Sequence, residues 1–250
     1  MAQRNAARKG ETHMKLTILG MNGPFPAVGG ACSGYFVQHE DTCVQLDMGT
    51  GTLAALTRLT APEKLTALVF SHWHFDHCSD VLPLLYRLSP TEPLAVYGPE
   101  DELSPVRAIL ASMPQVRLHT LHAGDTVQLG DVSLTAFTAR HPVPALMYRL
   151  TTGGRTLAYT GDTNTTDDLP ALADHADLLL ADGLFTEATW DAAKPHLSAA
   201  HVAKLAAEAS AARVIITHLS PAIDPETLLK EARAHRIDAL LAACGDTYQV

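Results

Sequence analysis

The sequence of 250 residues predicts a layered α/β domain, in which helices cover the faces of β-sheets. Short apolar or alternating runs bounded by Gly, Asp or Pro recur along the chain, and helix-like segments separate several of them. With 47% hydrophobic and 18% charged residues, the chain has ample material for a buried core. No charge block or low-complexity segment divides it, so we expect a loose tail at residues 1–13 and one domain at residues 14–250.

The predicted strands make the early part of the chain strand-rich. Three of them run directly into polar residues: TALVFS into His72, LAYT into Gly161 and Asp162, and VIIT into His218. Polar residues that end strands are natural candidates for a site in a layered α/β domain. The strands are expected at residues 15–20, 34–38, 42–47, 66–71, 94–98, 132–139, 146–151, 155–160, 177–182, 213–218 and 238–243.

Helix-like segments lie between several of the predicted strands. Ser198 is expected to cap the segment AAHVAKLAAEA, and Pro225 fits the first turn of the next helix. The helices are expected at residues 52–60, 79–88, 102–111, 198–210 and 225–235.

Charge and composition argue against several classes of function. A formal net charge of −9 opposes nonspecific nucleic-acid binding, which needs an excess of Lys and Arg. The apolar run LTILG is too short for a signal peptide, and no stretch of about 18 apolar residues suggests a membrane span. The four cysteines form no C-x-x-C pair, so the sequence predicts a protein of the reducing cytoplasm.

The segment SHWHFDHCSD, residues 71–80, places three histidines and an aspartate in six consecutive positions. In extended backbone, residues two apart point the same way, so His72 and His74 can direct their rings to one point. Asp76 and His77 follow where the chain should turn into a helix, and they can face a second point nearby. Unrelated loop histidines are the alternative, but four ligand-type residues rarely coincide with this spacing. The segment therefore predicts two adjacent metal half-sites.

The H-x-H-x-D-H pattern of this segment resembles the binuclear metal motif of the metallo-β-lactamase superfamily. The resemblance covers the chain from residue 15 to the C-terminus, because a third His, a bridging Asp and a last His follow in the superfamily's order. These are His141 in RHPVP, Asp162 in YTGDT and His218 in ITHLSP. The resemblance implies an αββα sandwich of the metallo-β-lactamase type.

The resemblance also implies two divalent metal ions that share one carboxylate. Imidazole and carboxylate ligands suit Zn²⁺, the expected metal, and also admit Mn²⁺ or Fe²⁺. Two dications would lower the pKa of a shared water and stabilise the oxyanion that forms, so the implied reaction is hydrolysis. One ion would take His72, His74 and His141, the other Asp76, His77 and His218, with Asp162 bridging them.

The tripeptide GDT occurs twice, so the bridging residue needs an argument. Only Asp162 falls between the third and the last His, as the order of the superfamily requires. Asp246, in the second copy, is interpreted as a turn residue near the C-terminus.

Three later segments, ADLLLAD, PHLSAA and IITHLSP, resemble the ribonuclease Z and phosphodiesterase branch of the superfamily. In that branch an acidic residue ends a strand, a His follows in an H-[ST]-type motif, and T-H-x-S-P comes last. Asp182 and His196 match the first two, although Asp182 stands where the branch usually has Glu. His141 in R-H-P-V-P departs from the G-H-[ST]-x-G-like setting of glyoxalase-type thioesterases, lactonases and many β-lactamases.

The pair Asp182 and His196 suits proton transfer. A carboxylate can hold one imidazole nitrogen while the other nitrogen gives its proton to a departing alkoxide. We predict that His196 is the general acid and Asp182 its partner, and Asp76 is counted with them as a catalytic candidate. The alternative is that His196 only caps the following helix.

The expected substrate is a small, nucleotide-like phosphodiester. His141 and Asp162 lie 21 positions apart, which leaves room for two strands and a turn but not for the tRNA-gripping arm that ribonuclease Z enzymes commonly insert there. With no arm and an acidic chain, a folded tRNA is a poor fit. The alternatives are an RNA 3′-end processing ribonuclease, an ester or lactone hydrolase, and a metal-dependent sensor without turnover.

Four further features could bear on the site, and three of them are left with two interpretations each. The loop at residues 20–30, rich in Gly and Pro, matches the first loop of the branch and could contact substrate through backbone N–H groups, or it is a plain hairpin connection. Asp47 could order metal ligands from below, and His201 could contact substrate or be solvated. The alanine-rich helix at 198–210 could pack on a second copy, as relatives often dimerise, or on its own sheet, which is commoner.

Overall fold

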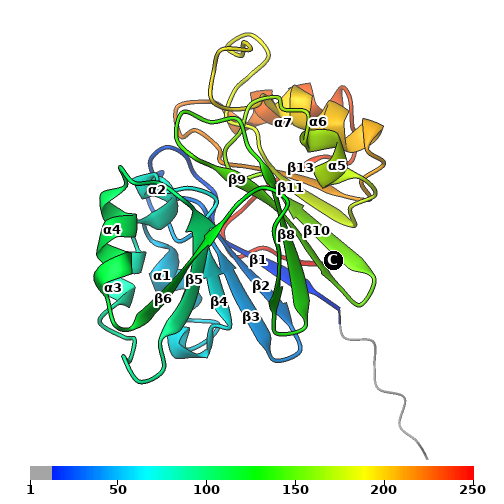
Figure 1. Cartoon of the computed structure of the whole chain (residues 1–250). Coiled ribbons are helices and arrows are strands. Elements are labelled where there is room, and N and C mark those ends of the chain that lie inside the picture. Colours follow the sequence, from blue (N-terminus) through cyan, green and yellow to red (C-terminus); the bar gives the residue numbers. More distant parts are fainter. Residues whose placement is uncertain (1–12) are drawn as a thin grey trace, which may run out of the picture.

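The computed structural model describes residues 13–250, and these form two β-sheets packed face to face between two layers of helices (Figure 1). This architecture confirms the αββα sandwich. The tail expected at residues 1–13 lies outside the described residues except for His13, which is exposed. Within the described chain, no helix is long and apolar enough to cross a membrane.

The first sheet combines antiparallel and parallel strands. It comprises, in spatial order, β14 (Thr247–Gln249), β1 (Lys15–Gly20), β2 (Gly34–His39), β3 (Thr42–Leu46), β4 (Ala67–Val69), β5 (Leu94–Pro99) and β6 (Val116–Leu121). The pairs from β14 to β3 are antiparallel, and those from β3 to β6 are parallel. The C-terminal strand β14 therefore forms one edge of this sheet, where it pairs with the N-terminal strand β1.

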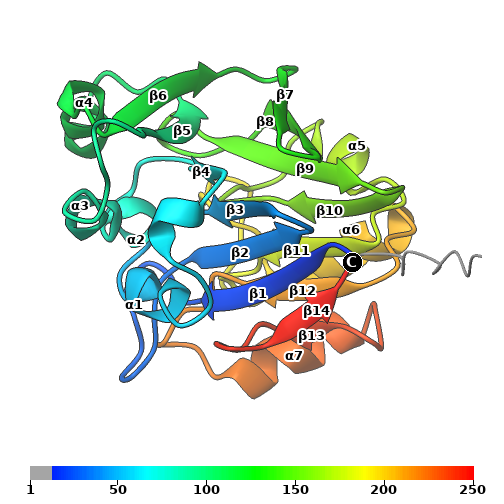
Figure 2. The ribbon, with the colours of Figure 1, turned by 90° about the horizontal axis from the view of Figure 1, so that it is seen from below.

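The second sheet has the same mixture in the second half of the chain. It comprises, in spatial order, β13 (Leu240–Leu241), β12 (Val214–Thr217), β11 (Leu178–Asp182), β10 (Arg155–Tyr159), β9 (Leu146–Thr152), β8 (Val132–Thr138) and β7 (Thr126–Leu129). The pairs from β13 to β10 are parallel, and those from β10 to β7 are antiparallel. Figure 2 shows the strands running from β6 and β7 at one edge to β14 and β13 at the other.

Helices cover the outer face of each sheet (Figure 1). The first sheet is covered by α1 (Thr52–Leu56), α2 (Phe75–Cys78), α3 (Val81–Leu84) and α4 (Pro105–Ser112), with a short 3₁₀ turn at Pro62–Lys64. The second sheet is covered by α5 (Leu169–Ala173), α6 (Ala199–Glu208) and α7 (Pro225–Arg233). Ser198 caps α6 by accepting from the His201 N–H at 3.2 Å, as predicted. The apolar face of α6 packs on its own sheet.

Three apolar clusters separate the four layers. Tyr35 and Val37 of β2 point into the cluster between the two sheets, whereas Phe36 points toward the helices. In β11, Leu178 and Leu180 face the first sheet, whereas Leu179 and Ala181 face α6. Both faces of these strands are buried, which explains why they read as continuous apolar runs and not as alternating ones.

The predicted elements match the structure except where the sequence signal is weak. The strands β6, β7 and β14 were not predicted, because half or more of their residues are polar, and the helix α5 was not predicted, because it has only five residues and contains a proline. The helix predicted at 79–88 is shorter, at Val81–Leu84, and it follows the separate helical turn α2. All eleven predicted strands are present, the last reduced to two residues in β13.

The carboxyl ends of the parallel strands meet at one edge of the sandwich. Asp47 follows β3, and residues 71–77 follow β4, its parallel neighbour. Asp162, Asp182 and His218 lie at or just after the ends of β10, β11 and β12, which are parallel to each other. Parallel pairing therefore gathers side chains that are far apart in the sequence.

Candidate metal centre

The motif segment leaves β4 as extended chain and then enters α2. His74 is the last extended residue, with φ −65° and ψ 148°, and α2 begins at the next residue. His72 and His74 point to the same side, and 3.0 Å separates His72 Nε2 from His74 Nδ1. Asp76 and His77 lie in the single turn of α2 and face a second point. The arrangement is the one that the alternating spacing predicts.

The first cluster, which we call the open cluster, is formed by His72, His74, His141 and Asp162. One ligand atom from each of these residues lies within 4.8 Å of the others, so the cluster could hold a metal ion. His74 Nδ1 lies 3.0 Å from His72 Nε2 and 3.1 Å from His141 Nε2. Asp162 Oδ2 lies 3.6 Å from His72 Nε2. Three imidazole nitrogens and a carboxylate oxygen form a donor set typical of zinc.

The second cluster, the closed cluster, is formed by Asp76, His77, Asp162 and His218. His77 Nε2 lies 3.2 Å from Asp162 Oδ1 and 3.6 Å from Asp76 Oδ2. The Oδ2 of Asp76, the Nε2 of His77, the Oδ1 of Asp162 and the Nε2 of His218 are buried without a hydrogen-bond partner among the described residues. Buried polar atoms are normally paired, so four such atoms around one point fit a bound cation.

Asp162 belongs to both clusters, as a bridging ligand must. Burial opposes its charge, but the imidazoles of His218 and His77 lower the pKa of Asp162 well below its usual value. Burial lowers the pKa of His141 to about 4 and the pKa of His72 well below its usual value. The neighbouring carboxylates, in contrast, overcome the effect of burial and raise the pKa of His77 well above its usual value. A divalent cation bound there would therefore displace the proton of His77.

The imidazoles are oriented by acceptors on their outer side. A proton on Nδ1 that is shared with such an acceptor leaves the lone pair on Nε2, the atom that faces the centre. The Nδ1 contacts are Ser71 Oγ at 3.0 Å for His72, Asp47 Oδ2 at 2.8 Å for His77, the Pro195 carbonyl at 3.2 Å for His141 and Ser33 Oγ at 3.1 Å for His218. His74 differs, because it presents Nδ1 to the centre.

Asp47 lies beneath the centre, where the sequence predicted that it orders ligands. Its carboxylate accepts hydrogen bonds from the Ser71 N–H and hydroxyl, both at 2.7 Å, and from the Tyr159 hydroxyl at 2.5 Å. The Asp47 backbone is left-handed, with φ 50°, a conformation that non-glycine residues adopt rarely and that Asp adopts more often than most. Asp47 follows β3 of the first sheet and accepts from Tyr159 of β10 in the second, so it connects the His77 ring to both sheets.

His218 is held from the side of the loop at residues 20–30. Its backbone is also left-handed, with φ 56°, which turns the ring toward the centre directly after β12. A Cβ at Gly23 would overlap the His218 ring, so the loop needs glycine at its closest approach. The predicted proximity of this loop to the site is therefore present in the structure.

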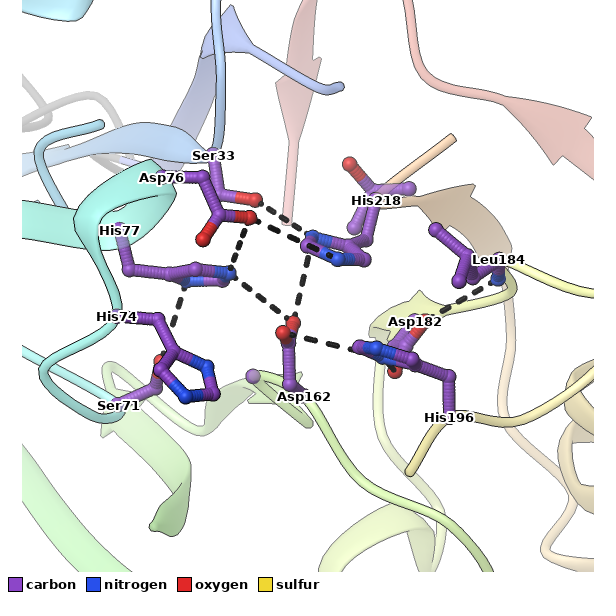
Figure 3. A network of polar contacts seen from close by, with 12 residues as sticks. Ser33, Ser71, His74, Asp76, His77, Asp162, Asp182, Leu184, His196 and His218 are labelled. Atoms are coloured by element: carbon purple, nitrogen blue, oxygen red, sulfur yellow. Dashed lines mark hydrogen bonds and ion pairs between the residues drawn. The ribbon is translucent and has the colours of Figure 1, made fainter. Parts of the chain in front are cut away.

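His196 and Asp182 form a pair beside the clusters (Figure 3). His196 Nδ1 lies 2.8 Å from Asp182 Oδ2 and 3.8 Å from Asp162 Oδ2. Asp182 also accepts from the backbone N–H groups of Thr163 and Leu184, so it reaches His196 although it is shorter than the usual Glu. Burial disfavours the imidazolium, but Asp182 outweighs this effect and raises the pKa of His196 to about 9. His196 can therefore carry a proton next to the metal centre.

Two residues singled out in the sequence lie outside the clusters. The His201 ring packs against Trp190 in a tilted arrangement with centroids 3.8 Å apart, and its Nδ1 lies 2.7 Å from Ser198 Oγ. Asp246 accepts from the Tyr248 hydroxyl at 3.0 Å, in the segment that leads into β14. In contrast, no role in orienting a ligand was predicted for the hydroxyl of Ser33 or of Tyr159, because an isolated hydroxyl carries no spacing signal.

Comparison with known proteins identifies the family of this chain and several chains of similar sequence and fold. The family model described as a β-lactamase superfamily domain matches residues 42–219. A probable metallo-hydrolase, YhfI of Bacillus subtilis (strain 168), is 29% identical over 231 residues, which cover 88% of this chain and 93% of the relative. The crystal structure of YhfI, titled a metallo-β-lactamase fold protein, superposes with a TM-score of 0.90 over 96% of this chain and 100% of that one, at 27% identity.

Two further similarities concern proteins with named activities. A ribonuclease Z of Natronomonas pharaonis is 25% identical over 301 residues, which cover 95% of this chain and 98% of the relative. The crystal structure of a diphosphatase from the PhnP family superposes with a TM-score of 0.77 over 95% of this chain and 98% of that one. At 19% identity, the second likeness concerns the fold alone.

Proposed function

This chain belongs to the metallo-β-lactamase superfamily, and from that premise we propose that it is a hydrolase with two divalent metal ions that cleaves small, nucleotide-like phosphodiesters. The His/Asp clusters support divalent metal binding in general. The observation that supports the finer proposal is the His196–Asp182 pair, because His196 would serve as a proton donor beside the two clusters.

The proposed ions are Zn²⁺, with Mn²⁺ or Fe²⁺ as substitutes. The open cluster would hold one ion and the closed cluster the other, with Asp162 shared. When bound, two such ions lower the pKa of a water molecule and neutralise the negative charge that builds up on phosphoryl oxygens. The buried, unpartnered atoms of the closed cluster support an ion there, because a cation would satisfy all four.

His196 supplies the proton that completes the hydrolysis. A water molecule gives one proton to solvent and adds to phosphorus as hydroxide, the bond to the leaving oxygen breaks, and that oxygen takes its proton from His196, which then regains a proton from solvent. Asp182 holds Nδ1 of His196, so Nε2 is the nitrogen that can present this proton. Asp182 also compensates the positive charge of the buried imidazolium before the transfer. Asp76, counted as a catalytic candidate in the sequence, contributes from within the closed cluster.

A small substrate is supported by what lies between His141 and Asp162. That segment consists of the loop at 142–145 and the tight hairpin of β9 and β10, and it contains no arm. The net charge of −9 also opposes a large polyanion. We propose a cytoplasmic location, and neither a membrane nor a folded tRNA is a proposed partner. A homodimer is proposed from the resemblance alone.

A second candidate is RNA 3′-end processing, which the similarity to a ribonuclease Z favours. Cleavage of an unmodified precursor tRNA at low enzyme concentration would support it. Ester or lactone hydrolysis and a metal sensor without turnover are further outcomes of the same experiments, because similar metal centres serve acyl and phosphoryl chemistry.

The test is metal content per chain, measured on protein prepared without chelator, together with hydrolysis of bis(p-nitrophenyl) phosphate. About two metal equivalents with metal-dependent cleavage are expected. Two metals without cleavage would redirect the assignment to esters and lactones. Absence of metal under every condition would overturn it.

Variants at two histidines test the role of the proton donor. His196→Ala should lower turnover by roughly 10²- to 10⁴-fold while metal content stays near that of the parent protein. His235→Ala, an exposed histidine after α7, serves as the matched control and should change neither value. If His196→Ala loses metal in parallel with activity, the assignment of His196 as the general acid is wrong.

A further inference from the structure

An apolar pocket of 260 Å³ adjoins the open cluster. We name it the Trp73 pocket and define it by Trp73, His74, Phe75, Asp101, Leu103 and Val143 among its lining residues. We infer that this pocket binds the aromatic base of a nucleotide, in the part of the phosphodiester that stays on the phosphate after cleavage. The inference rests on the proposed phosphodiesterase function and adds the class of group that the site recognises.

The floor of the pocket is rigid. Trp73 is 3% exposed, its indole N–H donates to the Pro99 carbonyl at 2.8 Å, and its ring packs on Phe70 with centroids 4.8 Å apart. A Cβ at Gly98 would press on the Trp73 ring, so the glycine leaves room for the indole. A fixed aromatic floor is suited to a flat ring, because its position needs no reorganisation on binding.

The rim of the pocket is apolar and exposed to solvent. Leu103 is 93% exposed and Phe75 is 64% exposed, although both are large apolar side chains. Val143, in the loop after His141, also lines the pocket. Single exposed apolar residues are common, but several around one hollow next to a reactive centre are typical of a ligand site. A base inserted between these side chains would remove their apolar surface from water.

The position of the pocket selects which part of the substrate enters it. His74 belongs both to the lining of the pocket and to the open cluster, so a group in the pocket would lie close to a phosphate held at that cluster. Figure 3 shows His74 and His196 on opposite sides of Asp162. Because His196 protonates the leaving oxygen, the leaving alcohol lies on the side of His196. The pocket therefore faces the group that remains esterified.

Asp101 gives the pocket a preference among aromatic rings. It is 9% exposed, and its Oδ1 accepts from the Leu103 N–H at 3.0 Å. Its Oδ2 receives no hydrogen bond from the described residues, and the side chain lines the pocket. A carboxylate oxygen accepts hydrogen bonds only, so it favours a ring that carries an amino group over one with a carbonyl in the same place.

The experiment uses three phosphodiesters with one leaving group: methyl p-nitrophenyl phosphate and the p-nitrophenyl esters of cytidine and uridine 5′-phosphates. With the zinc-loaded full chain, kcat/KM for the cytidine ester should exceed that for the methyl ester by about tenfold or more. Leu103→Ala should lower this ratio severalfold, and Ile237→Ala, which removes an exposed side chain far from the pocket, should leave it unchanged. Asp101→Asn should lower the preference for the cytidine ester over the uridine ester.

A binding measurement provides a readout that does not depend on turnover. The chain has two tryptophans, so Trp190→Phe leaves Trp73 as the only one. Cytidine 5′-phosphate should then quench Trp73 fluorescence, with weaker binding in the Leu103→Ala background. Equal kcat/KM values for the methyl and cytidine esters, or equal ratios for Leu103→Ala and Ile237→Ala, would overturn the pocket assignment alone. If none of the three diesters is cleaved, the proposed function itself fails.

Discussion

The open and closed clusters share Asp162 but differ in how their ligand atoms are arranged. In the open cluster, His74 and His141 are half-buried, and their nitrogens lie within hydrogen-bonding distance of each other. In the closed cluster, His77 and His218 are buried, and the atoms that face the centre have no partner among the described residues. One cluster borders solvent and the Trp73 pocket, and the other is enclosed by the two sheets.

This difference indicates that the two clusters have different roles in the site. The closed cluster is oriented from outside by Asp47 and Ser33, so its geometry is set by the packing of the sheets before a metal binds. In the open cluster, His74 presents Nδ1 and places its ring at the edge of a pocket. We therefore expect the closed cluster to matter more for stability and the open cluster more for contact with substrate.

The largest effect is expected at Asp162, because this residue belongs to both clusters. Asp162→Ala should reduce the occupancy of both metals and lower activity by roughly 10³-fold, more than the 10- to 100-fold typical of an outer partner. Asp246→Ala, in the second GDT tripeptide, is the control and should retain both metals. Metal analysis on the two variants decides the point, and full retention of both metals by Asp162→Ala would refute the bridging role.

The next largest effect is a difference in the free energy of unfolding between a variant of the closed cluster and a variant of the open cluster. Without His77, the buried Asp47 loses its imidazole partner, so His77→Ala should lower the free energy of unfolding by about 3 kcal/mol or more. His74→Ala, at the solvent edge, should lower it by about 1 kcal/mol or less. Urea unfolding of both variants with chelator present measures the difference. Equal losses in the free energy of unfolding would show that the two clusters contribute equally to stability.

A smaller effect is expected from the residue that orients the closed cluster from below. Asp47→Asn keeps the shape of the side chain but weakens the hydrogen bond that holds His77, so metal affinity should fall by roughly 10- to 100-fold. Competition with a chelator of known affinity gives this value. The weaker-bound ion should be the one in the closed cluster, and an unchanged affinity would mean that Asp47 serves folding only.

The smallest effect should come from Ser33. Ser33→Ala removes one neutral hydrogen bond to His218, worth about 1 kcal/mol, and should weaken metal binding in the closed cluster severalfold. Ser112→Ala deletes an exposed hydroxyl on α4 and should have no effect on metal binding. If Ser33→Ala weakens both metals equally, then the orientation of His218 is not specific to its own cluster.

Much of the candidate site could be predicted from the sequence because its signal is local. His72, His74, Asp76 and His77 lie on one short segment, and the two-residue repeat of extended chain followed by a helical turn decides where each side chain points. The later members, His141, Asp162 and His218, follow strands with clear apolar runs, so their order along the chain could be matched to the family.

Other parts of the site depend on contacts between distant residues. Ser33 meets His218 across 185 positions, and Tyr159 meets Asp47 across 112. No periodicity links such pairs, since their approach follows from how the two sheets stack. The Trp73 pocket was missed for the same reason, because its walls come from three separate loops. The short polar strands β6, β7 and β14 were missed because pairing with neighbours, and not their own residues, stabilises them.

The sequence by itself determined the class of fold, the family and the chemical types of the side chains at the centre, because apolar runs and motif spacing are properties of the chain. The tertiary structure alone decided which ligand atoms face the centre and which hydroxyl groups orient them. It also decided where the apolar pocket opens. Those features depend on the ends of parallel strands meeting at one edge of the sandwich, a geometry that exists only once both sheets have packed.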